Sequence, residues 1–125
     1  MPSRALVVDD SRAMRSILAN ILARLGFEVL QAGDGFEALA TLDNASPSVA
    51  LVLSDWNMPE MDGLQFVKAL RANPKFATLV VVMVTTETHM EQMLKALSAG
   101  ANEYIMKPFT AEMVEEKLRM LQVVG

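Results

Sequence analysis

The stretch Ala5-Leu6-Val7-Val8-Asp9-Asp10-Ser11 joins an uninterrupted apolar run to two carboxylates and a residue that can cap a helix. The apolar run lacks polar alternation, which is typical of a parallel strand buried on both faces. Ser11 is a plausible N-cap, because its side-chain oxygen can accept a hydrogen bond from a free N–H of the first helical turn. The stretch therefore predicts a buried strand that leads directly into a helix.

Four further short apolar runs follow, and segments of helical periodicity separate them. The runs are Glu28–Leu30, Val49–Leu53, Leu79–Val84 and Tyr104–Met106. After Ser11, apolar residues recur at i, i+3, i+4 and i+7 as far as Leu25, and Gly26 supplies the stop. The same spacing predicts helices over Phe36–Leu42, Leu64–Leu70, Met90–Leu97 and Val114–Leu121, with Gly100 ending the fourth and Thr110 capping the fifth.

A strand and a helix that alternate five times predict an α/β fold, with right-handed crossovers and helices on both faces of a parallel sheet. We expect a flavodoxin-like, doubly wound (βα)5 arrangement whose five-stranded parallel sheet has the order 2-1-3-4-5. A chain of 125 residues, 52% of them hydrophobic, is long enough for one buried core and too short for two. The prediction is a single domain over residues 1–125.

The composition excludes several functional classes. The chain has no cysteine, which rules out disulfides, Cys-ligated zinc and cysteine nucleophiles. A net charge of −4 with scattered basic residues disfavours direct nucleic-acid binding. The one histidine, His89, is interpreted as a solvated helix residue without a catalytic role. No apolar run approaches the roughly 20 residues that span a bilayer, so we expect a cytoplasmic protein that does not insert into membranes.

Charged or hydroxyl-bearing residues follow four of the five runs at the point where each expected strand ends, whereas Gln31-Ala32-Gly33 follows the second. They are Asp9-Asp10 after the first, Asp55 after the third, Thr85-Thr86 after the fourth and Lys107-Pro108 after the fifth. Ligands of doubly wound sheets bind beyond the carboxyl ends of the strands, and the order 2-1-3-4-5 makes the first and third strands neighbours at the switch point. Three carboxylates are therefore expected to converge there.

Each carboxylate also has an ordinary structural explanation. Asp9 and Asp10 could help to cap the first helix, and Asp55 could begin a turn. Three carboxylates a few ångströms apart repel one another, however, and at least one pKa must rise unless a cation neutralises them. Oxygen ligands with water retained in the shell suit Mg²⁺ or Mn²⁺ rather than zinc. The coincidence favours a divalent metal site.

The remaining strand ends add what phosphoryl transfer needs. Besides a cation, that reaction requires hydrogen-bond donors around the phosphoryl oxygens and a nucleophile in line. Lys107 can reach the carboxylates as a point positive charge, and the hydroxyl of Thr85 can donate to a phosphoryl oxygen. The strand ends therefore supply the set of groups that phosphoryl transfer with a divalent cation requires.

These motifs resemble the receiver domain of bacterial response regulators, and the resemblance covers the whole chain. It rests on Val7-Val8-Asp9-Asp10-Ser11, on Ser54-Asp55-Trp56-Asn57-Met58-Pro59-Glu60-Met61-Asp62-Gly63, on Met83-Val84-Thr85-Thr86 and on Lys107-Pro108-Phe109. It implies a two-component system in which a histidine kinase phosphorylates Asp55 from its phosphohistidine. The chain would catalyse its own phosphorylation and slow dephosphorylation without being an enzyme that acts on an external substrate.

The resemblance also implies how the phosphorylation site is built. Asp10, Asp55 and the backbone carbonyl of Asn57 would hold Mg²⁺, with Mn²⁺ as an acceptable substitute. Asp9 would act through water. Lys107 would pair with the acceptor and phosphoryl oxygens, and its peptide bond to the following proline is expected to be cis.

A switch pair is implied as well. The hydroxyl of Thr85 would move toward the phosphoryl oxygens, and Tyr104 would turn inward to fill the space behind it. A localised charge would thereby bias a two-state packing arrangement, and the face formed by the fourth helix, fifth strand and fifth helix would report the change. The ordinary alternative for Tyr104 is an aromatic side chain packed at the edge of the surface.

Within the family, the chain is most similar to single-domain chemotaxis regulators. This similarity implies a monomer that binds the flagellar motor switch and that an accessory phosphatase can dephosphorylate. Ser11-Arg12 and His89-Met90 depart from the enteric regulator and bear on partner surfaces. The alternative is a phosphorelay intermediate that passes the phosphoryl group to a histidine phosphotransfer protein. A phosphatase of the haloacid-dehalogenase type is disfavoured, because its Asp-x-Asp follows the first strand, where Asp9 and Asp10 are adjacent.

Overall fold

The computed structural model describes residues 3–45, 49–86 and 90–124, so the expectation for His89 lies outside the described residues. Within them, five parallel strands form one sheet in the order β2-β1-β3-β4-β5, which confirms the predicted topology. The strands are β1 (Arg4–Val8), β2 (Glu28–Ala32), β3 (Leu51–Asp55), β4 (Val80–Thr85) and β5 (Glu103–Met106).

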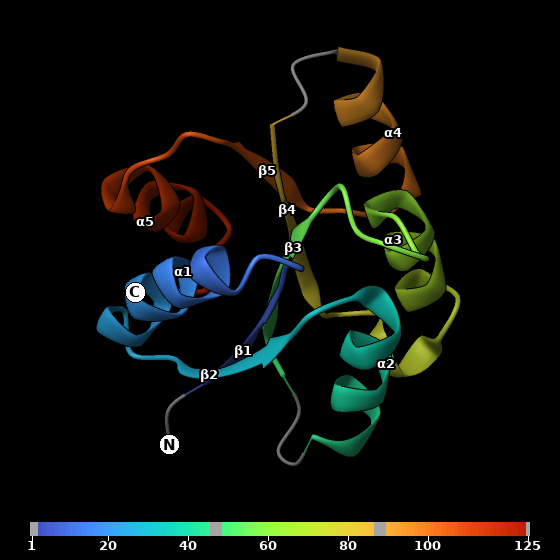
Figure 1. Ribbon diagram of the computed structural model, residues 1–125, viewed down its shortest axis with the longest axis horizontal. Coiled ribbons are helices and arrows are strands. Elements are labelled where there is room, and N and C mark those ends of the chain that lie inside the picture. Colours follow the sequence, from blue (N-terminus) through green and yellow to red (C-terminus); the bar gives the residue numbers. More distant parts are fainter. Residues whose placement is uncertain (1–2, 46–48, 87–89, 125) are drawn as a thin grey trace.

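Helices cover both faces of this sheet (Figure 1). Helices α1 (Arg12–Arg24) and α5 (Ala111–Met120) lie on one face, and α2 (Gly35–Asn44), α3 (Gly63–Arg71) and α4 (Met90–Ala99) lie on the other. A short 3₁₀ helix, η1 (Pro74–Phe76), precedes β4 and was not predicted. No helix in the described part of the chain is long and apolar enough to cross a membrane. The doubly wound α/β fold is confirmed.

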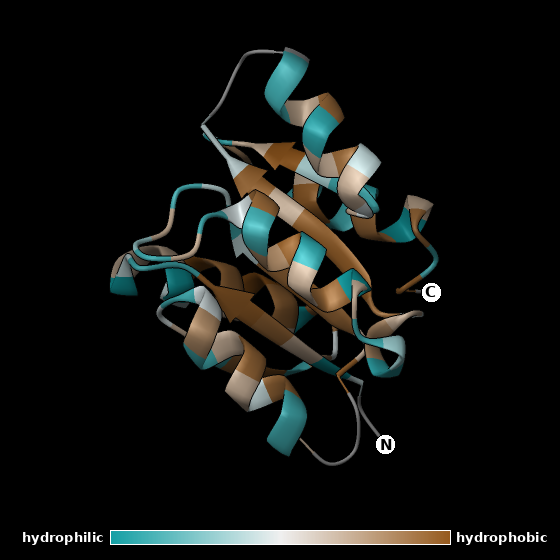
Figure 2. Ribbon diagram, turned by 90° about the vertical axis from the view of Figure 1, so that its right-hand side faces the viewer, coloured by the Kyte–Doolittle hydropathy of each residue, from teal (hydrophilic) through white to brown (hydrophobic). Residues whose placement is uncertain are grey.

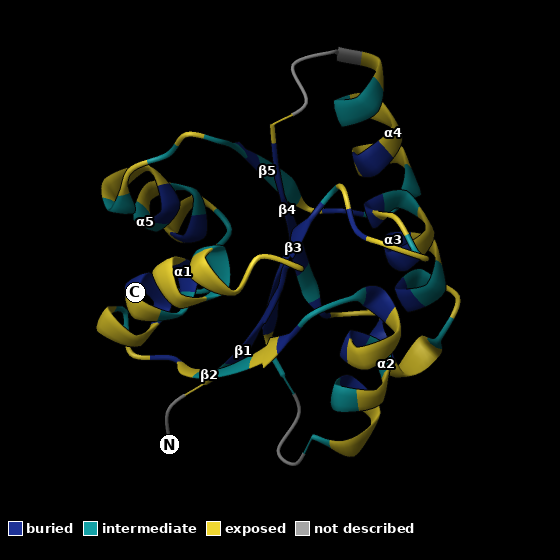
Figure 3. Ribbon diagram, viewed as in Figure 1, coloured by how far each residue is buried: buried dark blue, intermediate teal, exposed yellow. Residues whose placement is uncertain are grey.

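The sheet separates two apolar cores, because alternate residues of a strand point to opposite faces. Leu6 and Val8 of β1 belong to the core under α2, α3 and α4, whereas Ala5 and Val7 belong to the core under α1 and α5. All residues of β3 are buried, as the dark central strands of Figure 3 show. Figure 2 shows the same strands as an apolar layer between helices of mixed polarity.

Local signals place most of the helix boundaries. The side-chain oxygens of Ser11 and Thr110 accept hydrogen bonds from backbone N–H groups in the first turns of α1 and α5, as predicted. Gly26 and Gly100 follow α1 and α4 with φ of 98° and 119°, a backbone conformation that glycine adopts without steric cost. The cap of α2, Asp34, was not singled out from the sequence.

The register of the strands places the expected site residues at one edge of the sheet. The ends of β1 and β3 pair in register, so Asp9 and Asp55 lie at the same level. The ends of β4 and β5 pair likewise, which brings Thr85 level with the residue before Lys107. β4 begins one residue later than predicted, because the N–H of Leu79 still bonds back to η1.

Candidate functional site

Three carboxylates meet at the carboxyl ends of β1 and β3. One oxygen from each of Asp9, Asp10 and Asp55 lies within 4.8 Å of the other two. Asp9 and Asp55 are buried, with 1% and 8% of their surface exposed, whereas Asp10 is exposed. The cluster therefore has a buried base and one carboxylate that is open to solvent, as expected for a site that exchanges ligands with water.

Lys107 reaches this cluster from just beyond the end of β5. Its Nζ lies 3.3 Å from Oδ2 of Asp9 and 3.4 Å from Oδ1 of Asp55. The lysine side chain is only 16% exposed, so water and salt screen these contacts less than they would at an open surface. The peptide bond between Lys107 and Pro108 is cis, as the resemblance implies.

Hydrogen bonds fix both the carboxylate and the backbone carbonyl of Asp9. The backbone N–H of Ser11 donates to Oδ1 at 2.8 Å, and Lys107 donates to Oδ2, so both carboxylate oxygens already accept a hydrogen bond. Nη1 of Arg15 donates to the backbone carbonyl of Asp9 at 2.7 Å. Arg15 was not singled out from the sequence, and its position one turn after the N-cap of α1 was the only available signal. Asp9 is thus the rigid member of the cluster.

The pKa of Asp55 is raised above its ordinary value of 3.8, chiefly because burial desolvates the carboxylate. The charge of Lys107 lowers this pKa and the charge of Asp9 raises it, while hydrogen bonds from Lys107 and the backbone of Asn57 lower it further. The net rise means that these donors do not fully compensate for burial beside a second carboxylate. An all-oxygen set with surplus negative charge fits a hard divalent cation such as Mg²⁺.

The segment between β3 and α3 carries Asn57, which is exposed beside the cluster. The N–H of Gly63 donates to the carbonyl of Trp56 at 2.8 Å and closes this segment. A Cβ atom at Gly63 would lie 2.5 Å from Cε of Met83 and 2.9 Å from Cα of Trp56, so only glycine fits. Asp62 then starts α3 with a reciprocal capping box. The loop that presents Asn57 is therefore anchored at its far end.

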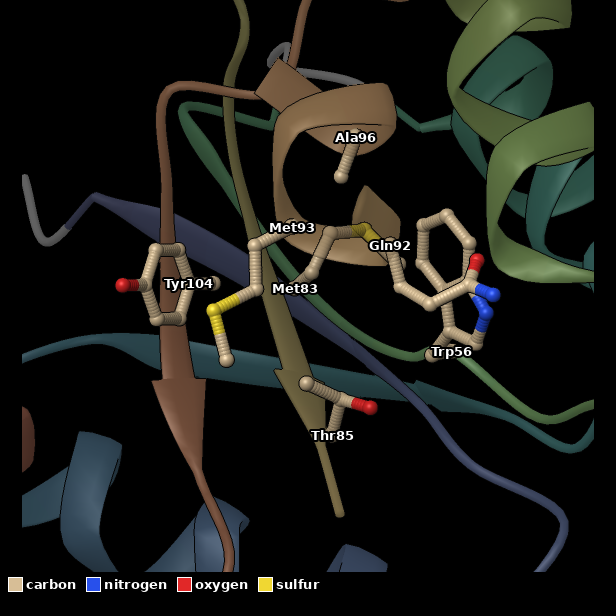
Figure 4. Close-up of a pocket in the computed structure, with 7 residues that line it drawn as sticks. All are labelled: Trp56, Met83, Thr85, Gln92, Met93, Ala96 and Tyr104. Atoms are coloured by element: carbon tan, nitrogen blue, oxygen red, sulfur yellow. The ribbon is translucent and has the colours of Figure 1, made fainter. Parts of the chain in front are cut away.

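Thr85 is buried and lines an apolar cavity of about 10 Å³ together with Tyr104. In Figure 4, the side chain of Met93 from α4 lies between the two, and the hydroxyl of Tyr104 points away from Thr85. The outer side of the Tyr104 ring meets Lys117, whose Nζ lies 5.2 Å from the ring centroid. The cavity has room for about one water molecule. An inward turn of Tyr104 therefore requires Met93 to move, a role that helical periodicity did not reveal.

Comparisons with known proteins agree with this geometry. The model of the family described as "Response regulator receiver domain" matches residues 5–119. Chemotaxis protein CheY1 of Helicobacter pylori strain J99 is 47% identical over 119 residues, which cover 94% of this chain and 95% of that protein. The chemotaxis protein CheY homolog of Campylobacter jejuni strain 81-176 is 47% identical over 116 residues, covering 92% of this chain and 88% of that protein.

Solved structures share the fold. Chemotaxis response regulator CheY4 of Vibrio cholerae superimposes with a TM-score of 0.89 at 36% identity, over 97% of this chain and 99% of that one. A CheY-like receiver domain protein from Methanospirillum hungatei JF-1 gives a TM-score of 0.87 at 30% identity, over 97% and 94% of the two chains. The family match, the chemotaxis relatives and the carboxylate cluster agree, and the chain belongs to the response regulator receiver domain family.

Proposed function

We propose that the chain acts as a single-domain response regulator in chemotaxis, and that Asp55 accepts a phosphoryl group from the phosphohistidine of a histidine kinase. The observation that carries this proposal is the convergence of three carboxylates and the Lys107 ammonium at one edge of the sheet. The names of the relatives support the chemotaxis role, and the family match over residues 5–119 supports the receiver function.

In this reaction, a carboxylate oxygen of Asp55 attacks phosphorus. The new P–O bond forms as the P–N bond of the phosphohistidine breaks, and the imidazole leaves with the electron pair and takes up a proton. Lys107, 3.4 Å from Asp55, balances the negative charge of the acceptor and phosphoryl oxygens. The buried hydroxyl of Thr85 donates to a phosphoryl oxygen from the neighbouring strand end. The protein contributes position and charge compensation, which is what phosphoryl transfer requires.

The carboxylates and the β3–α3 segment would also hold the metal ion. Asp10, Asp55 and the backbone carbonyl of Asn57 are the ligands we assign to Mg²⁺, with Mn²⁺ able to take its place. Asp9 would act through water, because other groups already engage both of its carboxylate oxygens. When bound, the ion neutralises the carboxylates and the phosphoryl oxygens. The raised pKa of Asp55 is the sign that this charge compensation is needed.

Phosphorylation would then bias the packing around Tyr104. As Thr85 follows the phosphoryl group, Tyr104 would turn inward and displace Met93, which would change the face formed by α4, β5 and α5. Exposed apolar side chains already lie on its two helices, with Leu94 54% and Met113 44% exposed. We propose the flagellar motor switch protein as the partner of this face, because the relatives are chemotaxis proteins.

The test is incubation with acetyl phosphate and Mg²⁺, followed by Trp56 fluorescence and intact-mass measurement. Trp56 follows Asp55 and lines the same cavity as Thr85, so its emission should change as the phosphoryl group is gained. Asp55→Asn and chelation with EDTA should abolish both signals. Asp43→Asn, which removes an exposed carboxylate on α2, is the matched control and should behave as the wild type. Unchanged mass gain in Asp55→Asn would refute the proposal.

A second measurement addresses the partner. The phosphorylated chain should bind a peptide from a motor switch protein more tightly than the unphosphorylated chain does. Efficient back-transfer to a histidine phosphotransfer domain, without any gain in peptide binding, would instead identify a phosphorelay intermediate.

A further inference from the structure

We propose that Arg15 is a positioning residue of the metal site, because its hydrogen bond to the backbone carbonyl of Asp9 fixes the direction of the Asp10 carboxylate. The inference rests on the proposed role of Asp10 as a ligand of Mg²⁺, and it adds a residue that acts on this ligand without touching the ion. Arg15 lies in the first turn of α1 and is partly buried.

Asp10 is the carboxylate of the cluster that its own contacts leave loose. It is exposed, and it lies between β1 and α1 in a segment, residues 9–11, that belongs to no helix or strand. Within the described part of the chain, its carboxylate forms no hydrogen bond or ion pair. The direction in which it faces the other two carboxylates therefore depends on the backbone that leads into it.

Arg15 holds that backbone. The carbonyl of Asp9 and the N–H of Asp10 belong to one planar peptide unit, so a bond that fixes the carbonyl also fixes the plane that leads into Asp10. Nη1 of Arg15 donates to this carbonyl at 2.7 Å, as expected for a strong hydrogen bond from a charged donor. No backbone N–H of the described residues donates to it. The guanidinium thus supplies the restraint that a sheet or a helix supplies elsewhere.

The guanidinium is itself oriented by a second bond. Its Nε donates to Oε1 of Gln31 on β2 at 3.3 Å, and the rigid fork of the group ties the two bonds together. The N–H of Asp9 donates to the carbonyl of Ala32 at 3.1 Å, and other groups engage both of its carboxylate oxygens. Loss of Arg15 would therefore leave the Asp9 side chain in place and release the peptide unit between Asp9 and Asp10.

The charge of Arg15 and its hydrogen bond have opposite effects on a bound cation. A positive charge beside the carboxylate cluster repels Mg²⁺, so removal of the charge should by itself strengthen metal binding. Loss of the positioning bond should weaken metal binding, because groups that orient metal ligands typically control affinity by about 10–100-fold. The sign of the change therefore separates the two effects.

The test is a titration of the full chain with MgCl₂ in the absence of a phosphoryl donor, followed by Trp56 fluorescence and by calorimetry. Arg15→Met removes the charge and the donors at similar side-chain length, and it should raise the half-saturating Mg²⁺ concentration roughly tenfold. Arg15→Lys keeps the charge and one donor group, and it should recover most of the affinity. Arg12→Met is the matched control, because it removes the same charge from an exposed position in the same turn. It should leave the half-saturating concentration unchanged or lower it.

A second readout separates metal binding from the reaction. At saturating Mg²⁺, the rate of Arg15→Met with acetyl phosphate should stay within about twofold of wild type, because only the affinity for the metal is changed. Gln31→Ala, an exposed change that removes the partner of Nε, should weaken Mg²⁺ binding by a smaller factor. Combined with Arg15→Met it should have no further effect, since both substitutions act through the same guanidinium. Circular dichroism shows that each variant is folded.

Three results would overturn the proposal. The first is a half-saturating Mg²⁺ concentration in Arg15→Met that is equal to or below that of wild type, and the second is an equal rise in Arg15→Met and Arg12→Met. The third is an effect of Gln31→Ala that persists in the presence of Arg15→Met. A wild-type chain that gives no signal with Mg²⁺ would instead refute the proposed metal site itself, and the role of Arg15 with it.

Discussion

Arg71 is the last residue of α3. Its side chain makes hydrogen bonds near the amino-terminal ends of β4 and β5, at the end of the sheet opposite to the carboxylates. Its guanidinium donates to the backbone carbonyls of Gly100, Phe76 and Leu79 at 3.0, 2.8 and 2.8 Å, and to Oδ1 of Asn102 at 3.0 Å. Burial lowers the pKa of Arg71, although the group stays protonated at neutral pH. One side chain thus connects α3 with η1, the start of β4 and the end of α4.

Replacing Arg71 with alanine should lower the free energy of unfolding by about 2–4 kcal/mol. Four hydrogen bonds from a charged donor are lost, each with a net value of roughly 1 kcal/mol because the site is half-buried and water can replace part of the contacts. Three backbone carbonyls lose a partner at the same time, two of them on the buried residues Phe76 and Leu79. A loss of this size is a large fraction of the stability of a small domain.

Urea unfolding, followed by Trp56 fluorescence and circular dichroism, measures the change. Arg71→Lys should fall between wild type and alanine, because an ammonium cannot reach four acceptors in a fork. Lys68→Ala, an exposed change on the same helix, should cost less than about 0.5 kcal/mol. A loss in Arg71→Ala no larger than in Lys68→Ala would refute the reasoning. Folded Arg71→Ala should still be phosphorylated by acetyl phosphate at a rate near that of wild type.

Three further outcomes are expected. Gly63→Ala should destabilise the fold by roughly 1–3 kcal/mol in urea, because the added Cβ meets the backbone of Trp56; unchanged stability would contradict that packing. Without metal, Asp55→Asn should be more stable than wild type. A raised native pKa makes the Asp55 contribution to stability fall as pH rises above 3.8, so this advantage should grow with pH and then level off; a constant difference across pH would be inconsistent with it. Met93→Ala should let Tyr104 turn inward and raise the affinity of the unphosphorylated chain for a motor switch peptide, and unchanged fluorescence anisotropy would exclude that role.

Most of the fold could be predicted because the signals are local. Apolar runs without alternation marked the buried strands, and Ser11 and Thr110 marked helix starts by a bond within one turn. The 3₁₀ helix Pro74–Phe76 was missed because three residues are too few to show periodicity. The contacts of Arg15 and Met93 with the site were missed because they depend on how α1 and α4 rest on the sheet.

The sequence by itself determined the order of the elements and which strand end carries each polar residue, because periodicity, caps and strand ends are properties of neighbouring residues. Only the tertiary structure decided that Lys107 lies between Asp9 and Asp55, which are 98 and 52 residues away in the chain. Strand order and register set such distances, and burial at the end of β3 then raises the pKa of Asp55.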